Sequence, residues 1–257
     1  MKLKVMDKNG LVRSEAAGNA LVTLVHPGRY HNGDAIVLEC EPGFYEARLD
    51  DGMPAALVFI PNNEARYVLP LNRRSYSPRS FKGKSHLITV RAASEEIVRA
   101  RRNLALNPYD SHDSGIYPHA LANSETRGEA IFAARNAIDG ACANQKHYPY
   151  PYQSWGINKD PNAWLKVEFG VAAEIDTIVL VLRADFPHDN YWVQADLAFS
   201  DGSVERIKLE KTGEPQKFKV SKRAVAWVKL ENLKQSDDPS PYPALTEIEA
   251  WGRITEG

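Results

Sequence analysis

The sequence has few cysteines and no long apolar run. Only Cys40 and Cys142 occur among 257 residues. Because they lie far apart, we expect two reduced, partly buried thiols rather than a disulfide framework. No apolar stretch approaches the ~20 residues that cross a bilayer, so no membrane span is expected. Met1–Lys4 leads into charged residues instead of an apolar signal core, which favours the cytoplasm, although a chain whose leader had been removed would begin in the same way.

The chain also lacks an excess of charge of either sign. It carries 32 Lys and Arg against 33 Asp and Glu, a formal net charge of -1. A nucleic-acid-binding protein normally has a concentrated basic face. The densest basic run here, residues 99–102, is better explained as a solvated linker face. Sequence signatures of serine hydrolases, zinc proteases and phosphate-binding loops are absent. We therefore expect no nucleic-acid partner and no catalytic activity.

Short apolar segments separated by turn residues fill the first third of the chain. Asn32-Gly33 and Asp51-Gly52 are typical of tight turns between paired strands. The expected strands are 21–25, 35–40, 44–49, 57–60, 66–71 and 86–90. This pattern predicts a small antiparallel β-sandwich over residues 1–93, of a family that the sequence does not identify.

A linker is expected over residues 94–102, where Glu95–Ala100 fits either a short helix capped by Ser94 or an extended segment. All five tryptophans follow this boundary, which favours a second domain, 103–257, with its own core. Its expected strands are 163–169, 175–182, 193–199, 204–209, 224–230 and 245–251. The sequence thus predicts an all-β protein of two β-sandwich domains.

Three motifs in the second half stand in a recognisable order. Asn103–Leu106 (Asn-Leu-Ala-Leu) precedes a corner at Asn136–Gly140 (Asn-Ala-Ile-Asp-Gly), and an alternating strand at Trp164–Gly170 follows (Trp-Leu-Lys-Val-Glu-Phe-Gly). In these motifs the C-terminal half resembles the coagulation factor 5/8 C-terminal (discoidin) group of galactose-binding-like domains, which includes the family 32 carbohydrate-binding modules. The resemblance implies a jelly-roll sandwich whose loops bind a ligand.

The resemblance also implies a structural calcium ion between the corner and the last strand. Asp139 and Glu247 match the positions of its ligands, and Asn136 offers a backbone carbonyl. Ala141 and Cys142, however, bring no oxygen where relatives often carry Asn. We therefore expect that no cofactor is required, and treat Asn136, Asp139 and Glu247 as the ligands if calcium binds.

Two aromatic loops are the candidate ligand sites. Residues 183–192 combine a cation, carboxylates, an imidazole, an amide and aromatics, the mixture that stacks on sugar C–H faces and bonds hydroxyls. Residues 147–155 add tyrosines held by prolines. The candidate ligand-binding residues are Arg183, Asp185, Phe186, His188, Asn190, Tyr150 and Trp155. The alternative for each loop is packing on its own sandwich, and for Trp192 the core is favoured.

Two polar loops are the weaker candidates. Residues 236–243 carry carboxylates and Tyr242, but a solvated loop is the better explanation. His112, His119, Asp110 and Asp113 are compatible with a metal or an acid–base pair, although a polar surface loop is again favoured. A glycan-active enzyme with its site at the domain junction is the least favoured function.

Two functions therefore remain from the sequence. The first is a non-catalytic carbohydrate-binding protein, which recognises a mono- or oligosaccharide through loops of the C-terminal sandwich. The alternative is an interaction or accessory module of a glycan-active assembly, whose aromatic loops contact a protein partner or a second copy of the chain. A concave site favours the first, and a flat, exposed aromatic patch the second.

Overall fold

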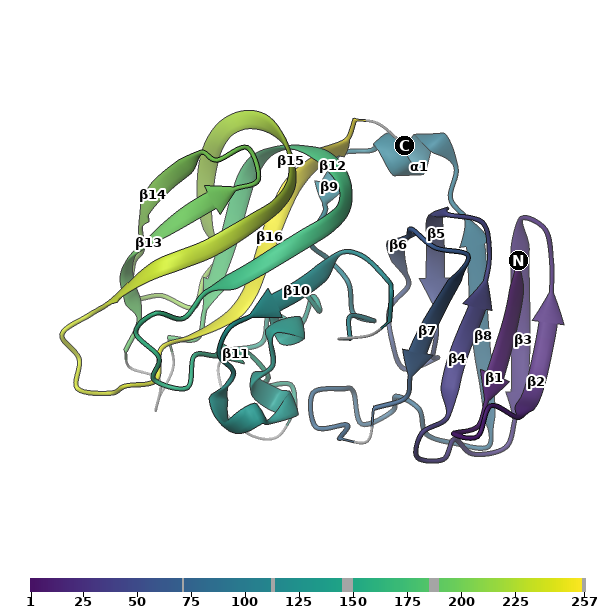
Figure 1. Cartoon of the computed structure of the whole chain (residues 1–257). Helices are drawn as coiled ribbons and strands as arrows, with labels where there is room; N and C mark the ends of the chain where they lie inside the picture. Colours follow the sequence, from purple (N-terminus) through teal and green to yellow (C-terminus); the bar gives the residue numbers. More distant parts are fainter. Residues whose placement is uncertain (71, 112–113, 145–149, 185–189, 256–257) are drawn as a thin grey trace.

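The structure, a computed structural model, describes residues 1–257 apart from 71, 112–113, 145–149, 185–189 and 256–257. Two β-sandwich domains lie side by side, and one short helix connects them (Figure 1). This confirms the all-β class expected from the sequence. Within the described ranges, no helix is long and apolar enough to cross a membrane.

The N-terminal domain consists of two four-stranded antiparallel sheets, ordered β2-β1-β4-β7 and β3-β8-β5-β6. The strands are β1 Lys2–Met6, β2 Val12–Ala17, β3 Leu21–Pro27, β4 Ala35–Glu39, β5 Gly43–Arg48, β6 Ala56–Ile60, β7 Glu64–Val68 and β8 Ser85–Ala92. Strands β1 and β2 were not expected. Strand β1 fully buries only Leu3 and Val5, between half-buried neighbours, a pattern too short for periodicity to identify.

The linker contains a helix, which settles the alternative left open by the sequence. Helix α1 spans Glu95–Arg99, and the Ser94 hydroxyl caps it by accepting a hydrogen bond from the Ile97 N–H at 3.4 Å. Both cysteines are free thiols, but only Cys40 is buried, whereas Cys142 is exposed.

The strands of the C-terminal domain join in the order β11-β16-β12-β15-β13-β14, with β10 paired to β12 and β9 to β16. They are β9 Arg102–Asn103, β10 His119–Ala122, β11 Trp155–Gly156, β12 Leu165–Leu182, β13 Trp192–Phe199, β14 Val204–Lys208, β15 Gln216–Gln235 and β16 Ala244–Ile254. Three 3-10 turns precede β11: η1 Thr126–Gly128, η2 Ala130–Phe132 and η3 Ala134–Ala137. Strand β12 merges two expected strands, and β15 is far longer than expected.

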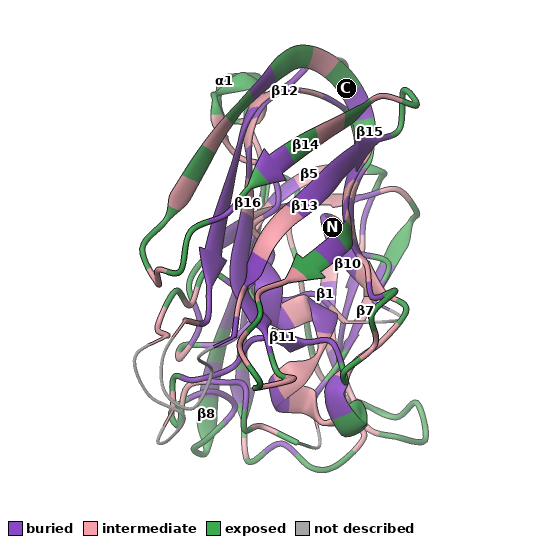
Figure 2. Ribbon diagram, turned by 90° about the vertical axis from the view of Figure 1, so that its left-hand side faces the viewer, coloured by how far each residue is buried: buried purple, intermediate pink, exposed green. Residues whose placement is uncertain are grey.

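The core of this domain lies along β12, β13 and β16, which are largely buried (Figure 2). Trp155 and Trp192 are both fully buried there, with ring centroids 6.1 Å apart. The expectation that Trp192 packs in the core is therefore confirmed. Trp155 does the same, and its indole N–H donates to the Ser124 carbonyl at 2.9 Å.

A segment of the C-terminal half completes the N-terminal core. Tyr109 and Ile116 follow the linker in sequence but belong to the N-terminal hydrophobic cluster. The Tyr109 hydroxyl donates to the Pro54 carbonyl and accepts from the Leu49 N–H at 3.2 Å. The linker thus separates the strands of the two domains, while Tyr109 and Ile116 reach back into the first sandwich.

The two domains also meet through a backbone bridge. Phe59 and Tyr117 exchange two N–H to carbonyl hydrogen bonds, each 2.9 Å long. Gly170, the glycine that ends the Trp-Leu-Lys-Val-Glu-Phe-Gly motif, has φ +78°, and a Cβ there would lie 2.6 Å from the Tyr117 ring. The bend in β12 therefore requires glycine both for its backbone and for the contact between domains.

Candidate binding site

Asn190 joins two of the loops that the sequence singled out. It follows the undescribed residues 185–189, and its side-chain amide donates to Gln235 Oε1 at 3.2 Å and to the carbonyls of Asp238 and Ser240. The loop before β13 is therefore tied to the loop before β16. Asn190 is buried and its amide is used by the protein, so the expected ligand contact is corrected to a framework role.

Arg183 joins the same region to the tyrosine-rich loop. Its guanidinium donates to the Tyr152 carbonyl and lies 6.0 Å from the Tyr152 ring centroid. Only 1% of Arg183 is exposed, so the expectation of an exposed hydroxyl contact is wrong. Because a buried guanidinium needs acceptors, the fold uses this cation to hold two loops together.

The other expected contacts divide into three groups. Trp155 lies in the core, so its ring is not a surface for stacking, which corrects that expectation. Tyr150 is half-buried, and burial raises the pKa of its hydroxyl. Asp185, Phe186 and His188 lie outside the described residues, so their expected roles stay predictions.

A pocket opens beside these loops, on residues that the sequence did not single out together. Its volume is about 340 Å³, and we call it the Tyr242 pocket. The lining residues are Thr126, Arg127, Phe132, Gly156, Ile157, Asn158, Lys159, Pro241, Tyr242, Pro243 and Ala244. They come from η1, η2, β11 with the turn after it, and the loop before β16. The pocket thus collects three segments that are far apart in the sequence, residues 126–132, 156–159 and 241–244.

Aromatic rings and cations alternate around this pocket. The Lys159 ammonium lies 4.9 Å from the Tyr242 ring centroid, and the Arg127 guanidinium 5.6 Å from that of Phe132. Tyr242 is 41% exposed and is the only aromatic residue in the exposed class among those described. A planar face open to solvent beside cationic donors suits a ring with C–H faces and hydroxyls.

The polar residues of the pocket are held in an uncommon backbone conformation. Five non-glycine residues have positive φ in the described part of the chain, and three of them line this pocket: Arg127, Asn158 and Lys159. Hydrogen bonds fix them, because the Asn158 N–H donates to Thr126 Oγ1 at 3.0 Å and the Arg127 N–H to Asn158 Oδ1 at 3.4 Å. Such strained positions concentrate at functional sites.

Little in the sequence pointed to this pocket. Tyr242 belonged to a loop for which solvation was favoured, and Arg127, Phe132, Asn158 and Lys159 belonged to no candidate group. Asn158-Lys159-Asp160 is an ordinary turn sequence, and its left-handed backbone is visible only after folding.

The expected calcium corner contains two buried carboxyl groups. The Gly140 N–H donates to Glu247 Oε2 at 3.1 Å, and Glu247 Oε1 is buried with no partner. Burial, and then the charge of Asp139, raise the pKa of Glu247 well above its usual range. Burial likewise raises the pKa of Asp139, although Arg135 opposes it.

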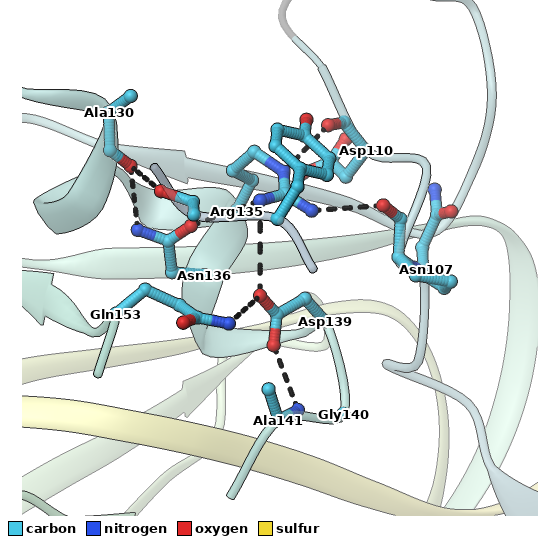
Figure 3. Close-up of polar contacts among 12 residues, drawn as sticks. Asn107, Asp110, Ala130, Arg135, Asn136, Asp139, Gly140, Ala141 and Gln153 are labelled. Carbon is cyan, nitrogen blue, oxygen red and sulfur yellow. Dashed lines mark hydrogen bonds and ion pairs between the residues drawn. The ribbon is translucent and has the colours of Figure 1, made fainter. Parts of the chain in front are cut away.

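These residues do not fit a calcium ion. Figure 3 shows that Asp139 already accepts hydrogen bonds from the Ala141 N–H and from Gln153, at 2.9 and 3.0 Å, and faces Arg135 at 3.9 Å. Only Glu247 brings an unused side-chain oxygen, whereas calcium takes six to eight oxygens. No group of three or more His, Cys, Asp or Glu residues in the described ranges is placed to hold a metal. Arg135 supplies the positive charge at Asp139 instead.

Comparisons with known proteins gave matches among solved structures. No family model matches the chain, and no curated protein does. A chitosan-binding module from Paenibacillus sp. IK-5 is 20% identical, with a TM-score of 0.42, covering 60% of this chain and 100% of the module. The lectin domain of lectinolysin, complexed with Lewis B antigen, is 18% identical, with a TM-score of 0.44, and covers 60% and 98%.

A third neighbour is the family 32 carbohydrate-binding module of Clostridium perfringens NanJ, in complex with galactose. It is 17% identical, with a TM-score of 0.40, and covers 51% of this chain and 91% of the module. Identities and scores this low do not extend the ligands of these neighbours to this chain. The chain is similar to carbohydrate-binding modules of the galactose-binding-like group over a share consistent with its C-terminal half.

Proposed function

We propose that this chain is a non-catalytic carbohydrate-binding protein and that the Tyr242 pocket holds one sugar ring. The observation that supports it best is the exposed Tyr242 ring in a concave site with Lys159, Arg127 and Asn158. Stacking of a sugar face on the ring and hydrogen bonds from the three polar residues would share the binding energy.

The affinity should be modest. Three or four hydrogen bonds contribute about 1 kcal/mol each, and association costs several kcal/mol of lost rotational and translational freedom. A dissociation constant of roughly 0.1–1 mM follows for a single ring. The backbone of the pocket is already fixed by the Thr126–Asn158 hydrogen bond, so little further ordering is needed.

The test is a glycan-array screen of the full chain, followed by calorimetry with the best hit. Tyr242→Ala should weaken binding at least tenfold, because it removes the only exposed aromatic face among the described residues. Val204→Ala is the matched control, since Val204 is 56% exposed in the same domain and does not line the pocket. Equal binding by Tyr242→Ala and the parent would place the site elsewhere.

The protein-interaction alternative makes a different prediction. It needs a flat patch of exposed aromatic rings, whereas Tyr242 is the one exposed aromatic residue of the described part. If no glycan on the array binds and the purified chain captures a partner through Tyr242, that alternative takes precedence.

A further inference from the structure

A second cavity lies between the two domains. It has a volume of about 310 Å³, within the range of small-ligand sites, and we call it the junction cleft. Its N-terminal wall is Pro70, Asn72, Ser75 and Tyr76, and its C-terminal wall includes Asp110, His119, Glu125 and Arg135. The cleft shares no residue with the Tyr242 pocket. The turn η1 nevertheless contributes to both, because Gly128 lines the cleft and Thr126 and Arg127 line the pocket.

The two walls are fastened to each other. The Ser75 hydroxyl donates to the Ala130 carbonyl at 2.7 Å, and the Arg135 guanidinium lies 4.6 Å from the Tyr76 ring centroid. Figure 3 shows Arg135 between Asp110 and Asp139. Its guanidinium donates to the backbone carbonyls of Pro108 and Asp110 at 2.9 and 3.0 Å. A cleft whose walls are already fixed loses little entropy when a ligand enters.

The basic side chains of the cleft are paired inside the protein. Asp110 is fully buried, and its Oδ1 lies 2.6 Å from His119 Nδ1 while its Oδ2 accepts from the Ala120 N–H. Arg135 is held by carbonyls, by Asn136 Oδ1 at 3.0 Å and by the charge of Asp139. Neither His119 nor Arg135 is therefore set up to bind an anion.

Glu125 gives the cleft an acceptor. One carboxylate oxygen accepts from the Ala134 N–H at 2.7 Å, and the other accepts no hydrogen bond from any described residue. An ionised carboxylate accepts hydrogen bonds only and repels anions. Pro70, Ala130 and Ala133 add a small apolar surface, and Asn72 adds an exposed amide. Ligand hydroxyls and a C–H face complement this set of groups.

We propose that the junction cleft is a second ligand site, which takes one uncharged, hydroxyl-rich ring such as a neutral sugar. Glu125 accepts from the ring hydroxyls, the Asn72 amide bonds a further hydroxyl, and the apolar surface of Pro70, Ala130 and Ala133 packs on the C–H face. The site exists only when both domains are present, because each supplies one wall.

The experiment follows alanine methyl signals of the full chain by NMR, with galactose, N-acetylglucosamine and fucose as probes. Ala130 and Ala133 report on the cleft, and Ala244 reports on the Tyr242 pocket. We expect at least one neutral sugar to shift the Ala130 and Ala133 signals in a saturable way. N-acetylneuraminic acid, which carries a carboxylate, should bind the cleft at least tenfold more weakly.

Variants separate this site from the first one. Glu125→Gln should weaken the Ala130 and Ala133 response at least tenfold, because a charged acceptor forms the stronger hydrogen bonds. Tyr242→Ala should leave it unchanged, and Glu96→Gln, an exposed carboxylate on α1, is the control. If Glu125→Gln fails to fold, Asn72→Ala tests the opposite wall.

Each outcome is decisive for the cleft. Saturable shifts at Ala130 and Ala133 that Glu125→Gln weakens support it. Shifts confined to Ala244 overturn it and leave the proposed function intact, whereas no shift at either place counts against both. Equal binding of the charged and neutral sugars overturns the assignment of an uncharged ligand.

Discussion

His26 and His86 stand directly opposite each other on β3 and β8, and both imidazoles point into the N-terminal core. Their ring centroids are 6.0 Å apart, and the Tyr30 ring packs against both, at 5.2 and 4.0 Å. Neither Nε2 has a hydrogen-bond partner. Burial, followed by the charges of Arg13 and His86, lowers the pKa of His26.

Acid should therefore destabilise the N-terminal domain. In the unfolded chain His26 takes up a proton near pH 6.5, while the folded His26 resists protonation. Below about pH 6.5 the unfolded state therefore binds more protons than the folded state. The contribution of His26 to the free energy of unfolding is fully present above about pH 6.5 and is lost as the pH falls towards the lower folded pKa. Urea unfolding at several pH values between 8 and 5 measures how the free energy of unfolding changes with pH.

The control for this pH dependence is another histidine. His26→Gln should flatten the fall in unfolding free energy, whereas His31→Gln, whose side chain is 70% exposed, should keep the slope of the parent. If His26→Gln keeps that slope too, buried His26 is not the source.

Gly170→Ala should destabilise the chain by about 2–4 kcal/mol. The left-handed backbone is unfavourable for alanine, and the new Cβ would overlap the Tyr117 and Phe59 rings, 2.6 and 2.9 Å away. Gly202→Ala is the matched control, because Gly202 has φ +84° with nothing within 4 Å. Denaturant unfolding measures the loss of unfolding free energy in both variants, and the difference between them is the cost of disturbing the contact between domains. Equal losses of unfolding free energy would show that this contact contributes nothing.

Arg183→Ala should lower the melting temperature. Arg183 is buried, and its guanidinium donates to the Tyr152 carbonyl. Its loss leaves that acceptor without its partner and unfastens two loops, at a cost of about 2–3 kcal/mol. Calorimetric melting checks this, with the exposed Arg127→Ala as the comparison, and an unchanged melt for Arg183→Ala would contradict the framework role.

Chelation should leave the melting temperature unchanged. An ion bound only to the folded state would stabilise it by mass action, so its removal would lower the melt. The corner at Asp139 already pairs with Arg135, and Glu247 alone offers an unused side-chain oxygen. A melt that falls in EDTA and recovers with excess calcium, but not with magnesium, would establish a calcium site despite this arrangement.

Local patterns in the sequence determined much of the fold. Alternating apolar residues identified β13 and the first part of β12, because burial of one face depends on residues two apart in the same strand. The capped helix at Ser94 was one of two readings that neighbouring residues allowed. Strands β1 and β2 were not predicted, because short, charged strands carry little periodic signal.

Tertiary structure alone decided the sites. Arg183, Asn190 and Trp155 have the chemistry of ligand contacts, yet each is buried because a partner distant in sequence covers it. Composition cannot tell a functional polar group from one that fastens loops, since both need the same donors and acceptors.

The same reason explains the two cavities. The Tyr242 pocket is built from three separated segments, and the junction cleft from two domains. Tyr109 enters the N-terminal core from beyond the linker, which no local pattern could reveal. The sequence determined which strands form and which residue types are present, whereas side-chain exposure and proximity depend on long-range packing that only the folded chain specifies.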